Sequence, residues 1–307
     1  MRVQLGRLTD GVHRPVLGGT KMEMNIEGRG RRPNDKRLQH FVPRSYLRAF
    51  ANEAGQLAAI LREPFEVRSV HVNTVAVESH FYKIRRADGT ASDDLEDALA
   101  KFDGKIPGIL ERATSSAPLT AADVQDMREL YANLAVRSHL GRDLLVDQVR
   151  AARERIESEY EAKFPGDEAE RRDRLLDGVI RSVFDHPDKY ATDPETVSRL
   201  AIIGRAQDLL KTMPRYACVF ESTDLEFIAS DAPFAALDPA SPPGPVESYG
   251  PKFSAPHIEL TLPLGRHHAV LFSNVPIRES RAHQCVWRRC HKRSDRILRQ
   301  ADDRCAP

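Results

Sequence analysis

The chain has 307 residues, of which 41% are hydrophobic and 30% are charged, so it has ample length for one large core or two modest ones. This composition excludes collagen, coiled-coil rods and long low-complexity disorder. No apolar run approaches the ~18 residues that a membrane-spanning helix needs, and the N-terminus has no apolar segment of signal-peptide length. The four cysteines form no CxxC pair. We therefore expect a cytoplasmic protein with reduced thiols and no membrane contact.

The formal net charge is only +1, but the charges are distributed unevenly along the chain. Residues 1–48 carry eleven Lys and Arg against four Asp and Glu, and residues 278–307 carry nine against four. The middle, 49–277, carries 26 against 37. Basic ends can neutralise the phosphates of a nucleic acid or fold back onto the acidic body, and both interpretations remain open.

The sequence divides into three parts. Residues 1–35 are Gly-rich without a sustained period and predict a flexible basic arm, whereas residues 278–307 predict a basic C-terminal tail or helix. Between them, residues 36–277 predict a single domain. Its first ordered segment is QHFVPRSYLRAF (39–50), which fits a short helix with Pro43 in its first turn. Tyr46, Leu47 and Phe50 are the expected core residues of this segment. The β-like runs 57–61 and 65–72 then predict a hairpin.

From Ser92 to residue 213 the apolar period becomes helical. A helix from Ser92 extends to Leu110 if Gly104 and Pro107 only bend it. Thr120 and Asp123 resemble a capping box for the next helix, which ends near Arg137. The charge-dense segments 142–163 and 168–185 are expected to form surface helices or a helical hairpin that turns at Phe164-Pro165-Gly166-Asp167. A fifth helix is expected over 195–213.

The last part of the domain is β-rich. The expected strands are 216–220, 225–230, 258–264 and 267–274, with residues 232–256 as a loop that holds seven of the twenty prolines. Because strands and helices do not alternate throughout, the fold class is α+β, with a helical middle over about 92–213 and short β-rich segments before and after it.

The sequence has no GxGxxG, GxxxxGK[ST], HExxH or GxSxG motif. Candidate sites must therefore come from polar residues that lie beside the predicted helices and strands. His40, after Gln39, is either a ligand or acid/base group, or a residue that bridges the chain before Pro43. Glu96 and Asp103 are seven residues apart, so both carboxylates lie on nearly the same helix face, where they bind a divalent metal or are simply solvated.

Two further positions complete the candidate set. Asp231 follows Ser230 at the end of a strand-like run and precedes Pro233, which suits either a catalytic or metal-binding carboxylate or an Asx turn. Arg137, at the end of an apolar-faced helix, is placed to clamp a phosphate or carboxylate, or to pair with an acid of the chain.

Several of these residues fit one family pattern. The segment QHFVPRSYLRAF resembles the opening motif of a bacterial family known as domain of unknown function 4238. The resemblance covers about residues 36–274, and the later landmarks follow in the same order. They are Phe81-Tyr82, Leu95-Glu96, Asp103, Arg137, the turn Ser230-Asp231-x-Pro233, and Pro263-Leu264.

The chain departs from that pattern at two places. It has Asp103 where the family usually has Glu, and Ala232 where the family turn usually has Asn. The resemblance implies that His40, Glu96, Asp103, Arg137 and Asp231 matter, but it supplies no activity.

Two functional hypotheses follow. In the first, the protein is a metal-dependent phosphodiesterase or nuclease acting on nucleic acid held by the basic ends. His40, Glu96, Asp103 and Asp231 would then bind Mg²⁺ or Mn²⁺, with His40, Asp231 and Arg137 taking part in catalysis. In the second, the protein is a non-catalytic binding or regulatory module in which the same polar residues form a structural network. The sequence indicates no oligomeric state.

Overall fold

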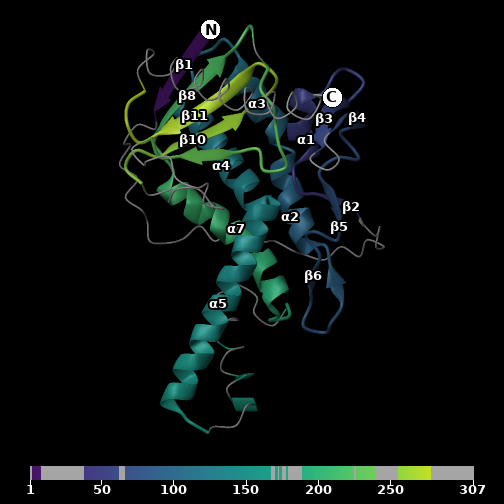
Figure 1. The fold of residues 1–307 in the computed structure, drawn as a ribbon, viewed down its shortest axis with the longest axis vertical. Helices are drawn as coiled ribbons and strands as arrows, with labels where there is room; N and C mark the ends of the chain where they lie inside the picture. The colour runs from purple at the N-terminus through teal and green to yellow at the C-terminus, as the bar shows by residue number, and fades with distance from the viewer. Residues whose placement is uncertain are drawn as a thin grey trace, which may run out of the picture.

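The computed structural model describes residues 2–7, 38–61, 66–166, 170–171, 173–174, 178, 189–224, 226–239 and 255–277. Helices dominate the middle of the chain and strands lie before and after them, which confirms the α+β class (Figure 1). The expected C-terminal tail, 278–307, lies outside the described residues.

The main sheet has five antiparallel strands in the order β1-β8-β11-β10-β9. The strands are β1 (Arg2–Arg7), β8 (Tyr216–Glu221), β9 (Ala235–Leu237), β10 (Glu259–Pro263) and β11 (His268–Ser273). β8 and β11 are buried along most of their length, because they lie in the middle of the sheet. Short segments with β-branched and aromatic residues therefore form the strands that the sequence predicts here.

Three two-stranded sheets accompany it. They pair β2 (Leu38–His40) with β5 (Val77–Ser79), β3 (Gln56–Leu61) with β4 (Glu66–His71), and β6 (Ile84–Arg85) with β7 (Ala91–Ser92). The pairing of β3 with β4 confirms the predicted hairpin. Between β2 and β3 lie the short helix α1 (Arg44–Leu47) and the 3₁₀ turn η1 (Arg48–Phe50).

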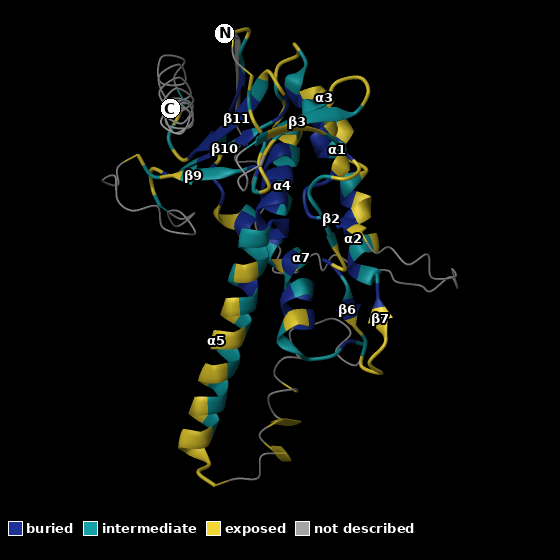
Figure 2. Ribbon diagram, turned by 45° about the vertical axis from the view of Figure 1, so that its right-hand side comes forward, coloured by how far each residue is buried: buried dark blue, intermediate teal, exposed yellow. Residues whose placement is uncertain are grey.

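The helices form the centre of the molecule. They are α2 (Asp94–Asp103), α3 (Ile106–Thr114), α4 (Ala121–Arg137), α5 (His139–Lys163) and α7 (Pro194–Thr212). Figure 2 shows α4 as a largely buried helix beneath the sheet. Tyr131 of α4 joins the two layers, since its ring lies edge-on to Phe272 of β11 at 5.9 Å and its hydroxyl donates to the Ala235 carbonyl oxygen.

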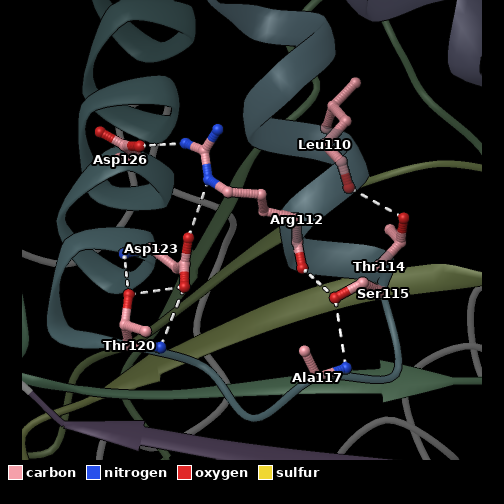
Figure 3. A network of polar contacts seen from close by, with 8 residues as sticks. All are labelled: Leu110, Arg112, Thr114, Ser115, Ala117, Thr120, Asp123 and Asp126. Carbon is pink, nitrogen blue, oxygen red and sulfur yellow. Dashed lines mark hydrogen bonds and ion pairs between the residues drawn. The ribbon is translucent and has the colours of Figure 1, made fainter.

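The start of α4 is fixed as the sequence predicts. The Thr120 hydroxyl accepts a hydrogen bond from the Asp123 amide at 3.2 Å, and the Asp123 carboxylate accepts one from the Thr120 amide at 3.0 Å (Figure 3). This capping box satisfies amides that the first turn leaves unpaired. Arg112 of α3 also binds Asp123 and Asp126, so the cap holds α3 beside α4.

The expected helix 92–110 is divided in two. α2 ends at Asp103, Gly104 and Lys105 separate the helices, and α3 begins at Ile106 with Pro107 in its first turn. A proline is tolerated there because its missing N–H is not needed in a first turn. The bend that the sequence allowed is therefore a break between two helices.

Two expectations for strands were wrong. Residues 226–230 form no strand, although the sequence predicted one over 225–230. The reason is that both edges of β8 are already paired, with β1 and β11, and Ile228 instead points to solvent. The loop after it, expected to be irregular, contains β9, which pairs with β10.

The N-terminal strand β1 falls inside the segment 1–35 that the sequence predicted to be a flexible arm. It pairs with β8 over Arg2–Arg7. The rest of that segment, 8–35, lies outside the described residues. Val3 and Leu5 alternate with polar residues, but two apolar positions are too short a signal to predict a strand, so pairing with β8 decides the structure of this segment.

Helix α5 projects away from the sheet, and only Leu145 of its residues is buried (Figures 1 and 2). It ends at a turn over residues 164–166, where Gly166 has a φ of 78°. In the described part of the chain, no helix is both long and apolar enough to cross a membrane.

Candidate functional site

Gln39 of β2 lies at the centre of the polar residues that the sequence singled out. Its side chain is fully buried, and both ends of its amide are hydrogen-bonded. The nitrogen Nε2 donates to the Glu96 carboxylate of α2 at 2.6 Å, and the oxygen Oε1 accepts from the Tyr82 main-chain amide at 2.6 Å. Gln39 therefore ties β2 to α2 and to the segment before β6, and its buried polar atoms are satisfied.

His40, the next residue, is half-buried and bonded to the main chain. Its Nε2 lies 3.1 Å from the Val72 carbonyl oxygen. Since a carbonyl only accepts, Nε2 carries the proton in the neutral ring. Burial lowers the pKa of the His40 imidazole; the Val72 hydrogen bond opposes this effect, and the nearby charge of Arg44 adds to it. The ring is therefore held in one tautomer and favours the neutral state.

Arg137, the last residue of α4, is 1% exposed. Both of its amino groups bind the carboxylate of Asp103 at the end of α2, and the Nη2 to Oδ2 distance is 3.1 Å. Its Nε donates to the Tyr82 hydroxyl at 2.9 Å. Burial alone would lower the pKa of the guanidinium, but Tyr82 and Asp103 raise it above its usual value. Arg137 therefore stays charged, and its donors are directed at groups of the protein.

The opening motif is anchored by its apolar and hydroxyl groups as well. Pro43 is buried and precedes α1, and its carbonyl oxygen accepts from the amides of Tyr46 and Leu47. Tyr46 is fully buried, as expected for a core residue, and its hydroxyl donates to the Pro263 carbonyl oxygen of β10 at 2.6 Å. The Ser45 hydroxyl donates to the Asp103 carbonyl oxygen at 3.0 Å. The motif thus contacts both the helices and the sheet.

Asp231 is placed differently from the other candidates. It is exposed, and its carboxylate accepts from the Ala232 amide at 3.1 Å. Ser230 closes the same turn with two hydrogen bonds to Ala232, and Pro233 is buried behind it. Within the described residues, no hydrogen bond or ion pair joins Asp231 to the network around Arg137. The Ser230 hydroxyl and the Asp231 carboxylate both accept a hydrogen bond from the Ala232 amide, so side-chain oxygens of both residues close this turn.

The four expected metal ligands do not form one cluster. In the part of the chain that the structure describes, no group of three or more His, Cys, Asp or Glu side chains is arranged to hold a metal ion. Glu96 is bonded to Gln39, Asp103 to Arg137, and His40 to a carbonyl. The set His40, Glu96, Asp103 and Asp231 therefore does not provide the several converging oxygen ligands that Mg²⁺ or Mn²⁺ takes.

Sequence reasoning missed several members of the network. Ser45 gave no signal, and the Val72 contact uses a main-chain carbonyl, which no residue pattern marks. Tyr82 was visible only as half of the Phe81-Tyr82 landmark. A second polar group lies beside the network, where Glu78 of β5 binds His139 at 3.3 Å and Arg142 at 3.0 Å, both from α5.

The family described as "Protein of unknown function (DUF4238)" matches residues 38–288, which is most of the chain. The chain belongs to the DUF4238 family. The match confirms the resemblance carried by the opening motif. Comparisons with curated proteins and with solved structures find no match.

Membership gives the network a family context. Five residues that carry the DUF4238 resemblance, from four separate segments, are joined by hydrogen bonds in the structure: Gln39, Tyr82, Glu96, Asp103 and Arg137. The DUF4238 turn at Asp231 lies apart from them. The landmarks of this chain thus include one interior network and one surface turn.

Proposed function

We propose that this DUF4238 chain is a non-catalytic binding module, in which the polar network locks the segment from β2 to α1 onto the helical middle. The observation that carries the proposal is the state of Arg137. Its side chain is buried and its donors are already directed at Asp103, Tyr82 and a main-chain carbonyl. A substrate phosphate could reach this buried guanidinium only by displacing the Asp103 carboxylate, which would leave Asp103 without its partner.

The rest of the network supports the same conclusion. Gln39 uses both ends of its amide, and the bond from His40 to a main-chain carbonyl fixes one ring tautomer. A catalytic centre instead leaves a nucleophile, base or ligand directed at a place where substrate binds. These groups are mutually satisfied, as in a buried structural network.

The alternative, a nuclease that uses Mg²⁺ or Mn²⁺, makes a different demand on the same residues. Asp231 would have to leave its turn and join Asp103 or Glu96, which are engaged with Arg137 and Gln39. Withdrawing Asp103 to a metal would leave Arg137 as an uncompensated buried charge, which costs about 3–5 kcal/mol, and withdrawing Glu96 would leave the buried Gln39 amide without its acceptor. The geometry therefore favours the module.

The test compares Asp103→Asn with Asp231→Ala in the full chain. We measure bound metal, cleavage of DNA and RNA with Mg²⁺ and with Mn²⁺, and the melting temperature. We expect no cleavage by any form, a clear loss of melting temperature for Asp103→Asn, and none for Asp231→Ala. Metal-dependent cleavage by the wild type that both substitutions abolish would contradict the proposal and support the nuclease.

A further inference from the structure

Three cations border the junction between α1 and the break that separates α2 from α3. The Ser45 hydroxyl bonds the Asp103 carbonyl oxygen and so fixes α1 at the end of α2. Arg44 precedes Ser45, Arg48 follows it by one turn, and Lys105 follows Asp103 by two residues. Helix α1 also packs against α3, which begins directly after Lys105. We call Arg44, Arg48 and Lys105 the junction patch.

The three cations of the junction patch are exposed, and none is neutralised by an acidic side chain of the described residues. All three side chains belong to exposed residues, and Arg44 donates only to the amide oxygen of Asn73, at 3.3 Å. Within the described residues, none of the three has a carboxylate at ion-pair distance. By contrast, Arg112 and Arg142 each bind acidic residues. The patch is therefore positive, and it joins two cations of the basic segment 1–48 to Lys105 of the domain that follows.

We propose that the junction patch binds the phosphates of a nucleic-acid backbone. The inference rests on the proposed function, since it names the partner of a module that binds without cleaving. Arg and Lys side chains on neighbouring elements neutralise successive phosphates, and the release of counterions from the nucleic acid drives the association. Such contacts position a nucleic acid without reading its sequence.

The composition of this surface distinguishes a nucleic acid from a protein or a membrane as the partner. Six large apolar side chains are exposed among the described residues: Leu38, Ile60, Val67, Phe164, Ile228 and Leu237. None of them lies on α1, α2 or α3. A protein interface buries an apolar centre, and a membrane-bound surface inserts apolar side chains. A phosphate backbone requires neither, so it fits the exposed cations of the patch.

The test is the fluorescence anisotropy of labelled 20-base-pair DNA and RNA duplexes, titrated with the full chain in EDTA at 50–200 mM salt. The variant is Arg48→Glu with Lys105→Glu. Its matched control is Arg155→Glu with Lys163→Glu, two exposed cations on the projecting part of α5, far from α1 in Figure 1. Both double variants change the net charge equally. We expect at least tenfold weaker binding for the junction variant only, and a slope of log K against log salt shallower by about 2.

This experiment measures binding alone, because EDTA prevents any metal-dependent cleavage. Its failure is therefore distinct from a failure of the proposed function, which the cleavage assay with Mg²⁺ or Mn²⁺ tests. Equal affinity in the two double variants would overturn the inference and assign any binding to the other cations of the chain, such as those in residues 8–37 and 278–307. Absence of binding by the wild type would also overturn it. If poly-glutamate competed as well as duplex with the same sensitivity to Arg48→Glu, the partner would be an acidic protein instead. Far-ultraviolet circular dichroism and melting temperature confirm that each variant is folded, and Arg48→Gln with Lys105→Gln replaces any variant that is not.

Discussion

The guanidinium of Arg137 holds both carboxylate oxygens of Asp103, although Arg137 ends α4 and Asp103 ends α2, 34 residues earlier. Arg137 is buried, whereas the Asp103 side chain is 28% exposed. The pair therefore joins two helix ends at the boundary between the interior and solvent. Because the buried Arg137 guanidinium has no access to water, the stability of the fold depends on keeping the Asp103 carboxylate beside it.

Arg137→Lys tests this dependence. A lysine ammonium cannot hold two carboxylate oxygens and the Tyr82 hydroxyl in the geometry of a guanidinium, so we expect the free energy of unfolding to fall by about 3 kcal/mol or more. Denaturant titration measures it. The control is Arg112→Lys, because Arg112 is half exposed in its pairs with Asp123 and Asp126 and should lose less than about 1 kcal/mol. Similar losses of unfolding free energy in the two variants would show that the buried Arg137 contacts contribute no more to stability than an exposed ion pair.

Leu47→Ala tests the anchoring of the opening motif. Leu47 is 6% exposed and packs in the main core, so truncation should lower the free energy of unfolding by about 2–5 kcal/mol. Leu38→Ala is the control, since Leu38 is 65% exposed in the same part of the chain and should change stability by less than about 0.5 kcal/mol. A small loss at Leu47 would place α1 outside the core.

Ala76→Gly tests a strained position. Ala76 has a φ of 54°, and its carbonyl oxygen accepts from the Phe41 amide, so the conformation is tied to the segment after His40. Glycine adopts this conformation without the Cβ clash, and we expect a gain of about 0.5–1 kcal/mol in thermal or denaturant unfolding. Ala58→Gly, in the extended strand β3, should have the opposite sign. A loss at both positions would argue against strain at Ala76.

His40→Gln tests the pH dependence. The pKa of His40 is lower in the folded chain than its usual 6.5, chiefly through burial, so the unfolded chain binds the proton more readily. The resulting stabilisation is complete above about pH 6.5 and is lost as the pH falls through the folded pKa. Glutamine can still donate to the Val72 carbonyl but does not titrate. Stability measured from pH 7.5 to 5 should therefore decline less steeply in His40→Gln, and parallel curves would contradict the assignment.

Much of the fold follows from patterns that are local in the sequence. The apolar spacing of Val124, Met127, Leu130, Tyr131 and Leu134 predicts the buried face of α4, and all five are buried. Thr120 and Asp123 predict its first turn, and the two β-like runs 57–61 and 65–72, of which the second alternates, predict the β3–β4 hairpin. These features could be read because each depends on residues within one or two turns, or on adjacent strands.

The tertiary structure decided which polar residues meet. The sequence by itself determined the family, helices such as α4 and α7, and the candidate residues. It did not determine their contacts, because Gln39 and Glu96 are 57 positions apart and the residues around Asp231 in the sequence are the same whether or not Asp231 joins them. Likewise, β8 pairs with β1 rather than with residues 226–230, which read more like a strand. Such pairings depend on which edges and buried groups remain to be satisfied once the core has formed, and no local pattern records that competition.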